Sequence, residues 1–299
     1  MLMNNKEPLN IGNYCVSFID LLGQRLEYKN EDLVPEFKFP EEKEQFISKL
    51  RNTVGRIYVL QRASQSFLNA AVGYKSPLRE ELPSNLKPIY DELKKVRLKE
   101  QRWSDGLVYF ISLMKSDVKC PINGLYFQLV ATGSLCFIGL AGRSPLRGSI
   151  DIAWATELQE GELYGTAVVK AYELESHIAQ YPRIVVGQRV VEFIIYNMNN
   201  TEPDIYGDFN RALGKACYEM LGQDVDGYYI VHYLGNVFRK YVTINQHKEL
   251  YDESVKFIRE QCQKWKDERN TKLSFRYNHL LSYFLTHPPS EPESGTTSS

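Results

Sequence analysis

The sequence lacks the features that would tie it to a membrane, to secretion or to nucleic acid. Its 299 residues carry a formal net charge of -1, so no bulk attraction to nucleic acid or to a membrane surface is expected. The polar start, Met1 to Pro8, has no apolar core of a secretory signal, and no stretch approaches the roughly 18 uninterrupted apolar residues of a membrane span. These absences predict a cytoplasmic protein.

Cysteine and histidine are too scattered to mark a metal or catalytic site. The five cysteines include no C-x-x-C pair and no histidine at zinc spacing, which predicts reduced, mostly buried thiols. The five histidines are dispersed, and none is assigned a catalytic role. Apolar residues, in contrast, make up 43% of the chain, enough for the core of one elaborated domain or of two.

Hydrophobic patterning predicts an α+β fold with one mixed sheet. The last residues, 288–299, have no large apolar side chain and are expected to be disordered. The expected elements, in order, are a strand over 14–22, a long helix over 41–72, a short helix over 89–98, a hairpin over 101–113, a helix over 121–141, a strand over 146–155, a helix over 163–178, a strand over 183–187, a helix from 189, a strand pair near 224–231, and helices over 246–268 and 271–285.

Two aspartates stand at the ends of apolar runs that read as buried strands. Asp20 follows Ser17-Phe18-Ile19, and Asp105 precedes Gly106-Leu107-Val108 at an Asp-Gly turn. A carboxylate at the rim of an apolar strand is costly unless it is hydrogen-bonded, paired or bound to a metal. If the two strands are neighbours, both carboxylates converge on a site suited to magnesium; the alternative is that each aspartate only caps a turn.

A third stretch carries a family resemblance. Pro145-Leu146-Arg147-Gly148-Ser149-Ile150-Asp151 is followed by Glu162-Leu163-Tyr164-Gly165-Thr166 and by the helix ending Leu174-Glu175-Ser176. This pattern resembles class III nucleotidyl cyclases, and in particular the bacterial pyrimidine cyclase family of the Pycsar antiphage systems. The resemblance covers roughly 14–193, and the segments 224–233 and 274–283 also look like that family.

The resemblance implies a fold and a metal centre. The fold would be a class III cyclase-like, ferredoxin-like mixed sheet with packed helices: a catalytic domain over 10–200 and a C-terminal helical extension over 201–287 packed on it. By position, Asp20, Asp105 and a main-chain carbonyl beside Asp20, that of Leu21, would bind two divalent cations, Mn²⁺ or Mg²⁺. Such cations activate the ribose 3'-hydroxyl and neutralise the triphosphate.

Base recognition differs from the purine-specific relatives at the matching positions. Where those enzymes have a lysine and an aspartate, this chain has Gln101 and Glu162. Further candidates to line a smaller pocket are Arg102, Tyr14 and Tyr164. A pyrimidine base is the resulting prediction. The alternatives are that the two tyrosines are core aromatics and that Gln101 and Arg102 begin a solvated strand.

The helix after Gly165 lacks the asparagine and arginine of the purine cyclases, because Val169 and Glu173 stand there. Losing one such stabiliser of the transition state typically costs on the order of 3 kcal/mol unless it is replaced. Candidate replacement cations are Arg147, Arg102 and Lys170; Arg147 is alternatively the partner of a surface carboxylate. The Asp224-Val225-Asp226-Gly227 run is a weak metal signal without further ligands.

The sequence therefore predicts a homodimeric cyclase with composite sites between two chains arranged head to tail. It would convert UTP, or else CTP, to the 3',5'-cyclic monophosphate and pyrophosphate. The resemblance adds an antiphage second messenger and a separate effector protein. A purine-specific enzyme of the same fold and a non-catalytic nucleotide-binding module are the alternatives, and Val169 and Glu173 favour the second of these.

Overall fold

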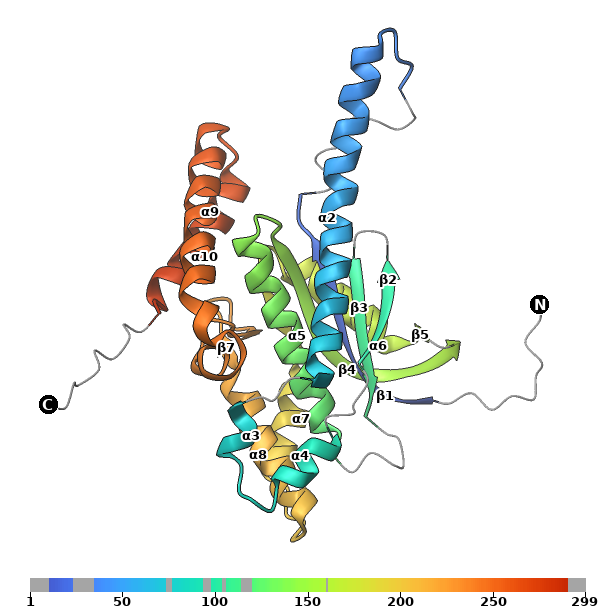
Figure 1. The fold of residues 1–299 in the computed structure, drawn as a ribbon, viewed down its shortest axis with the longest axis vertical. Coiled ribbons are helices and arrows are strands. Elements are labelled where there is room, and N and C mark those ends of the chain that lie inside the picture. The colour runs from blue at the N-terminus through green and yellow to red at the C-terminus, as the bar shows by residue number, and fades with distance from the viewer. Residues whose placement is uncertain are drawn as a thin grey trace, which may run out of the picture.

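One mixed β-sheet organises the chain (Figure 1). The computed structural model describes residues 11–23, 35–73, 77–93, 98–103, 106–113, 120–159 and 161–289. Among these residues, eight strands form the sheet in the order β2-β3-β1-β4-β6-β8-β7, with β5 paired to β4, so the predicted α+β class is confirmed. The strands are β1 (Ile11–Leu21), β2 (Lys99–Trp103), β3 (Gly106–Ser112), β4 (Leu146–Gln159), β5 (Glu162–Tyr164), β6 (Ile184–Val186), β7 (Leu221–Gln223) and β8 (Tyr229–Val231).

Helices cover both faces of this sheet. α6 packs on β1 and β4 from one face, whereas α5 packs between the sheet and the pair α8 and α9 on the other (Figure 1). The helices are α2 (Pro40–Gly73), α3 (Pro77–Glu81), α4 (Lys87–Leu93), α5 (Ile122–Ala141), α6 (Thr166–Glu173), α7 (Gln188–Met198), α8 (Ile205–Glu219), α9 (His247–Asp267) and α10 (Thr271–Thr286), with shorter turns η1 (Leu174–Ile178), η2 (Phe238–Val242) and η3 (Ile244–Gln246).

β1 occupies the middle of the sheet because both of its faces are apolar. All its residues from Tyr14 to Ile19 are buried, and it pairs antiparallel with β3 on one side and β4 on the other. Val16 and Phe18 face the cluster under α6, whereas Cys15 faces the larger cluster around α5. A continuous apolar run is the pattern expected of a strand covered on both faces.

α5 is the central helix of the larger core. By length and hydropathy it is the one described helix that meets the measure of a membrane span, and 78% of its most apolar window is buried inside the protein. The side chain of Gln128 fixes it to the sheet by donating to the main-chain carbonyls of Cys15 (3.1 Å) and Tyr109 (3.0 Å). At Gly133 a Cβ would lie 2.4 Å from the Phe238 ring, so this helix face must be small.

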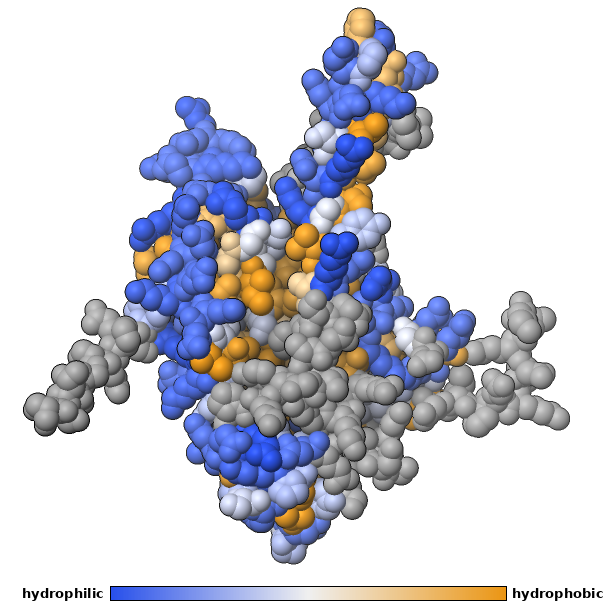
Figure 2. All heavy atoms as spheres, in the orientation of Figure 1, coloured by the Kyte–Doolittle hydropathy of each residue, from blue (hydrophilic) through white to orange (hydrophobic). Residues whose placement is uncertain are grey.

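α2 extends well beyond the sheet and packs on it only through part of its length (Figure 1). Leu60 is buried against the small cluster that includes Ile19 and Leu107, whereas Leu50 and Tyr58 are exposed. Apolar side chains gather on the surface between α2 and the α9–α10 pair (Figure 2). The long predicted helix is confirmed, with bounds one residue wider at each end.

Two expectations from the sequence were wrong. The segment 205–219 forms α8, which was not predicted; Asp204 begins it, accepting a hydrogen bond from the Gly207 amide at 2.8 Å. The helix expected from residue 163 begins only at Thr166, because 162–164 pair with β4 as β5. Gly165 has φ of +145°, and a Cβ there would lie 2.6 Å from Ala155 Cα, so the chain turns from strand to helix at this glycine.

His247, at the start of α9, makes the stability of the fold depend on pH. Its Nδ1 lies 2.7 Å from Thr243 Oγ1, its Nε2 is buried without a partner among the described residues, and its ring packs on Phe137. Burial, together with the charge of Arg239, lowers the pKa of His247 to about 4. Between pH 6.5 and pH 4 the unfolded chain, with a histidine pKa near 6.5, therefore binds a proton at this residue that the folded chain does not bind.

We expect the free energy of unfolding to fall as pH decreases from about 6.5 to 4, by on the order of 3 kcal/mol for this histidine. Urea unfolding at several pH values measures the slope. His247→Asn keeps a polar atom near the Nδ1 position and removes the titration, so its slope should be shallower. Parallel pH profiles for wild type and variant would contradict this account.

Candidate functional site

Asp20 lies at the end of β1, between the start of β3 and the start of β4. In the strand register it is opposite Gly106 on one side and Arg147 on the other. The two strands are thus neighbours, as a shared cation site requires. Asp105, which precedes Gly106 in the sequence, lies outside the described residues, so its convergence with Asp20 stays a prediction. Leu21, whose carbonyl is a predicted ligand, is the last residue of β1 and pairs with Leu146.

Gly148 allows β4 to approach β1 closely at this point. A Cβ at Gly148 would lie only 2.5 Å from the main-chain oxygen of Phe18 and 3.0 Å from the Ile184 side chain. Its amide donates to the Arg183 carbonyl at 2.9 Å, which ties β4 to the start of β6. In the Arg147-Gly148 pair, the arginine therefore carries the charge at the site, and the glycine leaves room for the neighbouring strand.

Arg147 lies between two carboxylates. Its Nη2 is 3.3 Å from Asp20 Oδ2, and its Nε is 2.5 Å from Glu175 Oε1 on η1. The side chain of Glu175 is 2% exposed and that of Asp20 is 19% exposed, so Asp20 is the one of the two that solvent reaches. Arg147 therefore pairs with carboxylates, as its alternative interpretation expects, although Glu175 is buried and not at the surface.

The carboxylate of Asp20 and the main-chain oxygens beside it are hard donors, the kind that Mg²⁺ and Mn²⁺ prefer. Within the residues that the structure describes, no group of three or more His, Cys, Asp or Glu side chains gathers around a common point. The donor set fits a hard cation that is held by few protein ligands and that also coordinates water and phosphate. Arg147 contacts the same carboxylate, through Asp20 Oδ2.

Three predicted base-binding residues lie together at another place, on β2 and β5. Gln101 Oε1 accepts a hydrogen bond from the Leu163 amide at 3.3 Å, which joins β2 to β5. Glu162 is exposed, and the Tyr164 side chain is exposed at 65%. Arg102 is also exposed and pairs with Glu100 on the same strand, 3.0 Å away. Tyr164 is not a core aromatic, so that alternative is wrong for this residue.

Tyr14 lies far from Asp20 but in the same apolar cluster as Leu163 of β5. Tyr14 is buried against Phe110, six residues along β1 from Asp20, a strand length of about 20 Å. Burial raises the pKa of Tyr14, and the charge of Glu157 adds to this. The core alternative thus describes Tyr14 better than base contact does. Lys170 on α6 acts on the Asp151 carboxyl, whose pKa is raised by burial and only partly lowered by that ammonium.

The outer face of α6 carries the two unusual residues of the motif. Val169 is 53% exposed, and Glu173 is exposed one turn later. Tyr172 beside them is also exposed at one edge, while its ring contacts Phe18 at 5.4 Å between centroids. Neither Val169 nor Glu173 carries a positive charge, so this face of α6 offers no cation at these two positions.

Arg183 organises a second ionic cluster that sequence reasoning missed. Its Nη1 and Nη2 lie 2.6 Å from Asp224 Oδ2 and from Asp226 Oδ2, and its guanidinium stacks on the Tyr181 ring at 4.4 Å. His279 Nε2 on α10 is 2.9 Å from Asp224 Oδ1. The Asp-x-Asp-Gly run, a weak metal signal in the sequence, thus binds an arginine. The sequence did contain a signal for this cluster: Arg183 stands at the start of an apolar strand, and an arginine buried there needs an acidic partner.

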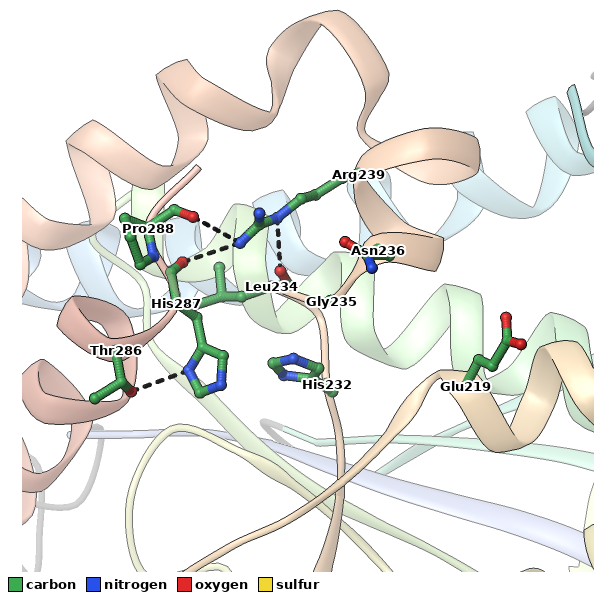
Figure 3. Close-up of a pocket in the computed structure, with 9 residues that line it drawn as sticks. All are labelled: Glu219, His232, Leu234, Gly235, Asn236, Arg239, Thr286, His287 and Pro288. Atoms are coloured by element: carbon green, nitrogen blue, oxygen red, sulfur yellow. Dashed lines mark hydrogen bonds between the residues drawn. The ribbon is translucent and has the colours of Figure 1, made fainter. Parts of the chain in front are cut away.

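Two cavities lie elsewhere on the protein. One, of about 490 Å³, is lined by polar groups near the end of α10, including His232, Arg239 and His287 (Figure 3). Arg239 donates there to the main-chain carbonyls of Leu234 and Pro288, at 2.8 Å each. Burial, with the charges of His287 and Arg239, lowers the pKa of His232 to about 4, so its imidazole is neutral at pH 7. The other, of about 460 Å³, includes Asp151, Gly187 and Asp226.

The comparisons with known proteins add a structural likeness. No protein-family model and no curated protein matches the chain. Among solved structures, the chain is similar to the crystal structure of the adenylyl cyclase CyaB from P. aeruginosa, with 11% sequence identity and a TM-score of 0.39. The likeness covers 63% of this chain and 83% of that one. At this degree of superposition it assigns neither a residue nor an activity.

Replacing Glu175 by Gln removes one buried carboxylate from Arg147 while keeping the side-chain shape. We expect the free energy of unfolding to drop by about 3 kcal/mol or more, because breaking a buried ion pair leaves a charge without compensation. Urea unfolding measures this. Glu173→Gln makes the same chemical change two residues away on an exposed side chain and should change stability by no more than about 0.5 kcal/mol. Equal losses in both variants would refute the role of Glu175.

Proposed function

We propose that the chain is a nucleotidyl cyclase that converts a pyrimidine nucleoside triphosphate, UTP or else CTP, to its 3',5'-cyclic monophosphate. The observation that carries the proposal is the register that sets Asp20 beside Arg147 and opposite Gly106, the residue after Asp105. A carboxylate for a divalent cation and a guanidinium for phosphate then share one edge of the sheet. The motif resemblance supplies the reaction that uses such a pair.

In this proposal Asp20, the Leu21 carbonyl and Asp105 hold two divalent cations, Mg²⁺ or Mn²⁺. When bound, such cations lower the pKa of the ribose 3'-hydroxyl and neutralise phosphate charge. The 3'-oxygen loses its proton and attacks the α-phosphorus in line, the bond from that phosphorus to the bridging oxygen breaks, and pyrophosphate leaves. Arg147 exchanges its contact with Asp20 for a contact with phosphate, and Glu175 keeps its guanidinium in place.

The motif resemblance implies a site shared between two copies of the chain, and exposed apolar surface supports that proposal. Trp103 on β2 and Tyr172 on α6 are exposed and both contact the Phe18 ring, so together they offer apolar surface for a second copy. We therefore propose a head-to-tail homodimer.

Gln101 and Glu162 would read the base with an acceptor and donor set that differs from a lysine and an aspartate. We propose that they favour a pyrimidine and that the product serves as a second messenger in antiphage defence, acting on a separate effector. A non-catalytic nucleotide-binding module is the second candidate. The observation that favours it is that Arg147 already has two carboxylate partners.

The test is incubation of the full chain with each of the four ribonucleoside triphosphates and Mn²⁺, with products identified by mass. We expect cyclic UMP or cyclic CMP together with pyrophosphate. Cyclic AMP or GMP as the main product would overturn the base assignment only. The absence of every cyclic product would overturn the enzyme and leave the binding module.

Asp20→Asn should lower turnover by about 100-fold or more, because the neutral amide is a poor ligand for a hard cation. Initial rates with saturating substrate and Mn²⁺ measure this. Asp208→Asn is the matched control, since Asp208 on α8 is exposed and pairs only locally with Arg211 among the described residues. Full activity of Asp20→Asn would refute the assignment of Asp20.

A further inference from the structure

Arg276, on α10, is a half-buried arginine without an acidic partner among the described residues. Its guanidinium donates to Oε1 of Gln180, a neutral amide. Arg183 and Arg147, in contrast, each contact two carboxylates, while Arg239 donates to main-chain carbonyls. An enclosed cation held by an amide alone has charge left for an anion.

Gln180 links Arg276 to the site around Asp20. Its amide nitrogen donates to the carbonyls of Ser176 (3.3 Å) and His177 (2.6 Å), within or beside the turn η1. The same turn carries Glu175, which holds Arg147. The chain of contacts from α10 to Asp20 therefore passes through Gln180, η1 and Arg147.

α10 is fixed at this place by a second connection. One turn after Arg276, His279 contacts Asp224 at 2.9 Å, and Asp224 is held by Arg183. The carbonyl of Arg183 in turn accepts from the Gly148 amide, next to Arg147. The start of β4, the start of β6 and the first half of α10 are thus joined by polar contacts, and α10 presents Arg276 from a fixed position.

The contacts through Gln180 and η1 bring Arg276 and Arg147 to the same part of the protein. Burial lowers the pKa of Arg276, and the positive charge of Arg147 lowers it further. Like charges repel each other, and an anion bound between them removes that repulsion. A polyphosphate, with several negative oxygens on adjacent phosphorus atoms, is the ligand that both guanidiniums would bind at once.

We propose that Arg276 binds the terminal phosphates of the nucleoside triphosphate together with Arg147. This inference rests on the proposed cyclase function and names its missing cation. The two other candidates are placed less well. Lys170 acts on Asp151, and Arg102 pairs with Glu100 on β2. The cation absent from α6, where Val169 and Glu173 stand, is then supplied by the C-terminal helix.

The experiment measures binding of inorganic tripolyphosphate to the full chain by titration calorimetry without metal, so it does not depend on turnover. Arg276→Gln removes the charge and should weaken binding by about 10-fold or more. Gln180→Glu gives Arg276 a carboxylate partner, although it removes the two hydrogen bonds from Gln180 to Ser176 and His177, and should weaken binding similarly. Arg276→Lys should retain most of the affinity. Lys272→Gln, which removes one positive charge from an exposed position one turn earlier on α10, should bind as wild type does.

Unfolding midpoints show that each variant is folded, and Gln180→Glu provides the test should Arg276→Gln fail to fold. Binding within twofold of wild type for the folded variants would overturn the role of Arg276. If wild type and those variants all form cyclic nucleotide, and the KM of the variants equals that of wild type, the inference fails and the cyclase stands. If wild type forms no cyclic product while tripolyphosphate binding depends on Arg276, the reaction fails and the anion contact stands.

Discussion

The contact of Arg147 with both Asp20 and Glu175 is the interaction on which the candidate site depends. It joins three parts of the chain that are far apart in sequence: the end of β1, the start of β4 and the turn after α6. Glu175 is buried, whereas solvent reaches Asp20, so the contact of Arg147 with Asp20 is the more easily exchanged of the two. In the proposed function, a cation bound at Asp20 would replace that contact, and Arg147 could then turn toward an anion.

The C-terminal region belongs to this site as much as to the scaffold. β7 and β8 extend the sheet beside β6, and α9 packs on α5 in the main core. Arg143, after α5, pairs with Glu260 on α9, and His279 holds α10 against the Asp224 loop. A truncation after residue 200 would remove the partners of Arg183 and expose the apolar face of α5, so both the fold and the site would change.

The sequence predicted the sheet and its long helices well because their apolar runs are continuous and bounded by glycine or proline. It failed where tertiary pairing overrides local pattern. Glu162-Leu163-Tyr164 reads as the start of a helix, yet it pairs with β4, and the turn at Gly165 separates the two states. The hairpin of β2 and β3 followed from the Asp-Gly signal, whereas the pairing of β3 with β1 was only a condition of the predicted site. The partners of Arg147, Arg183 and Arg276 did not, since each lies on an element whose packing no local pattern specifies.

In the proposed function, phosphate and base contacts come from different strands of the sheet. Asp20 and Arg147 lie opposite each other on β1 and β4, and Arg276 would add its charge from α10. Gln101 lies on β2, level with Phe18 through Val108, and its side chain accepts from the Leu163 amide of β5. If a second copy completes the base pocket, polyphosphate binding needs one folded chain, whereas discrimination between bases needs two. Changes in the surface that meets the second copy would then alter base selectivity and turnover before they alter the affinity for polyphosphate.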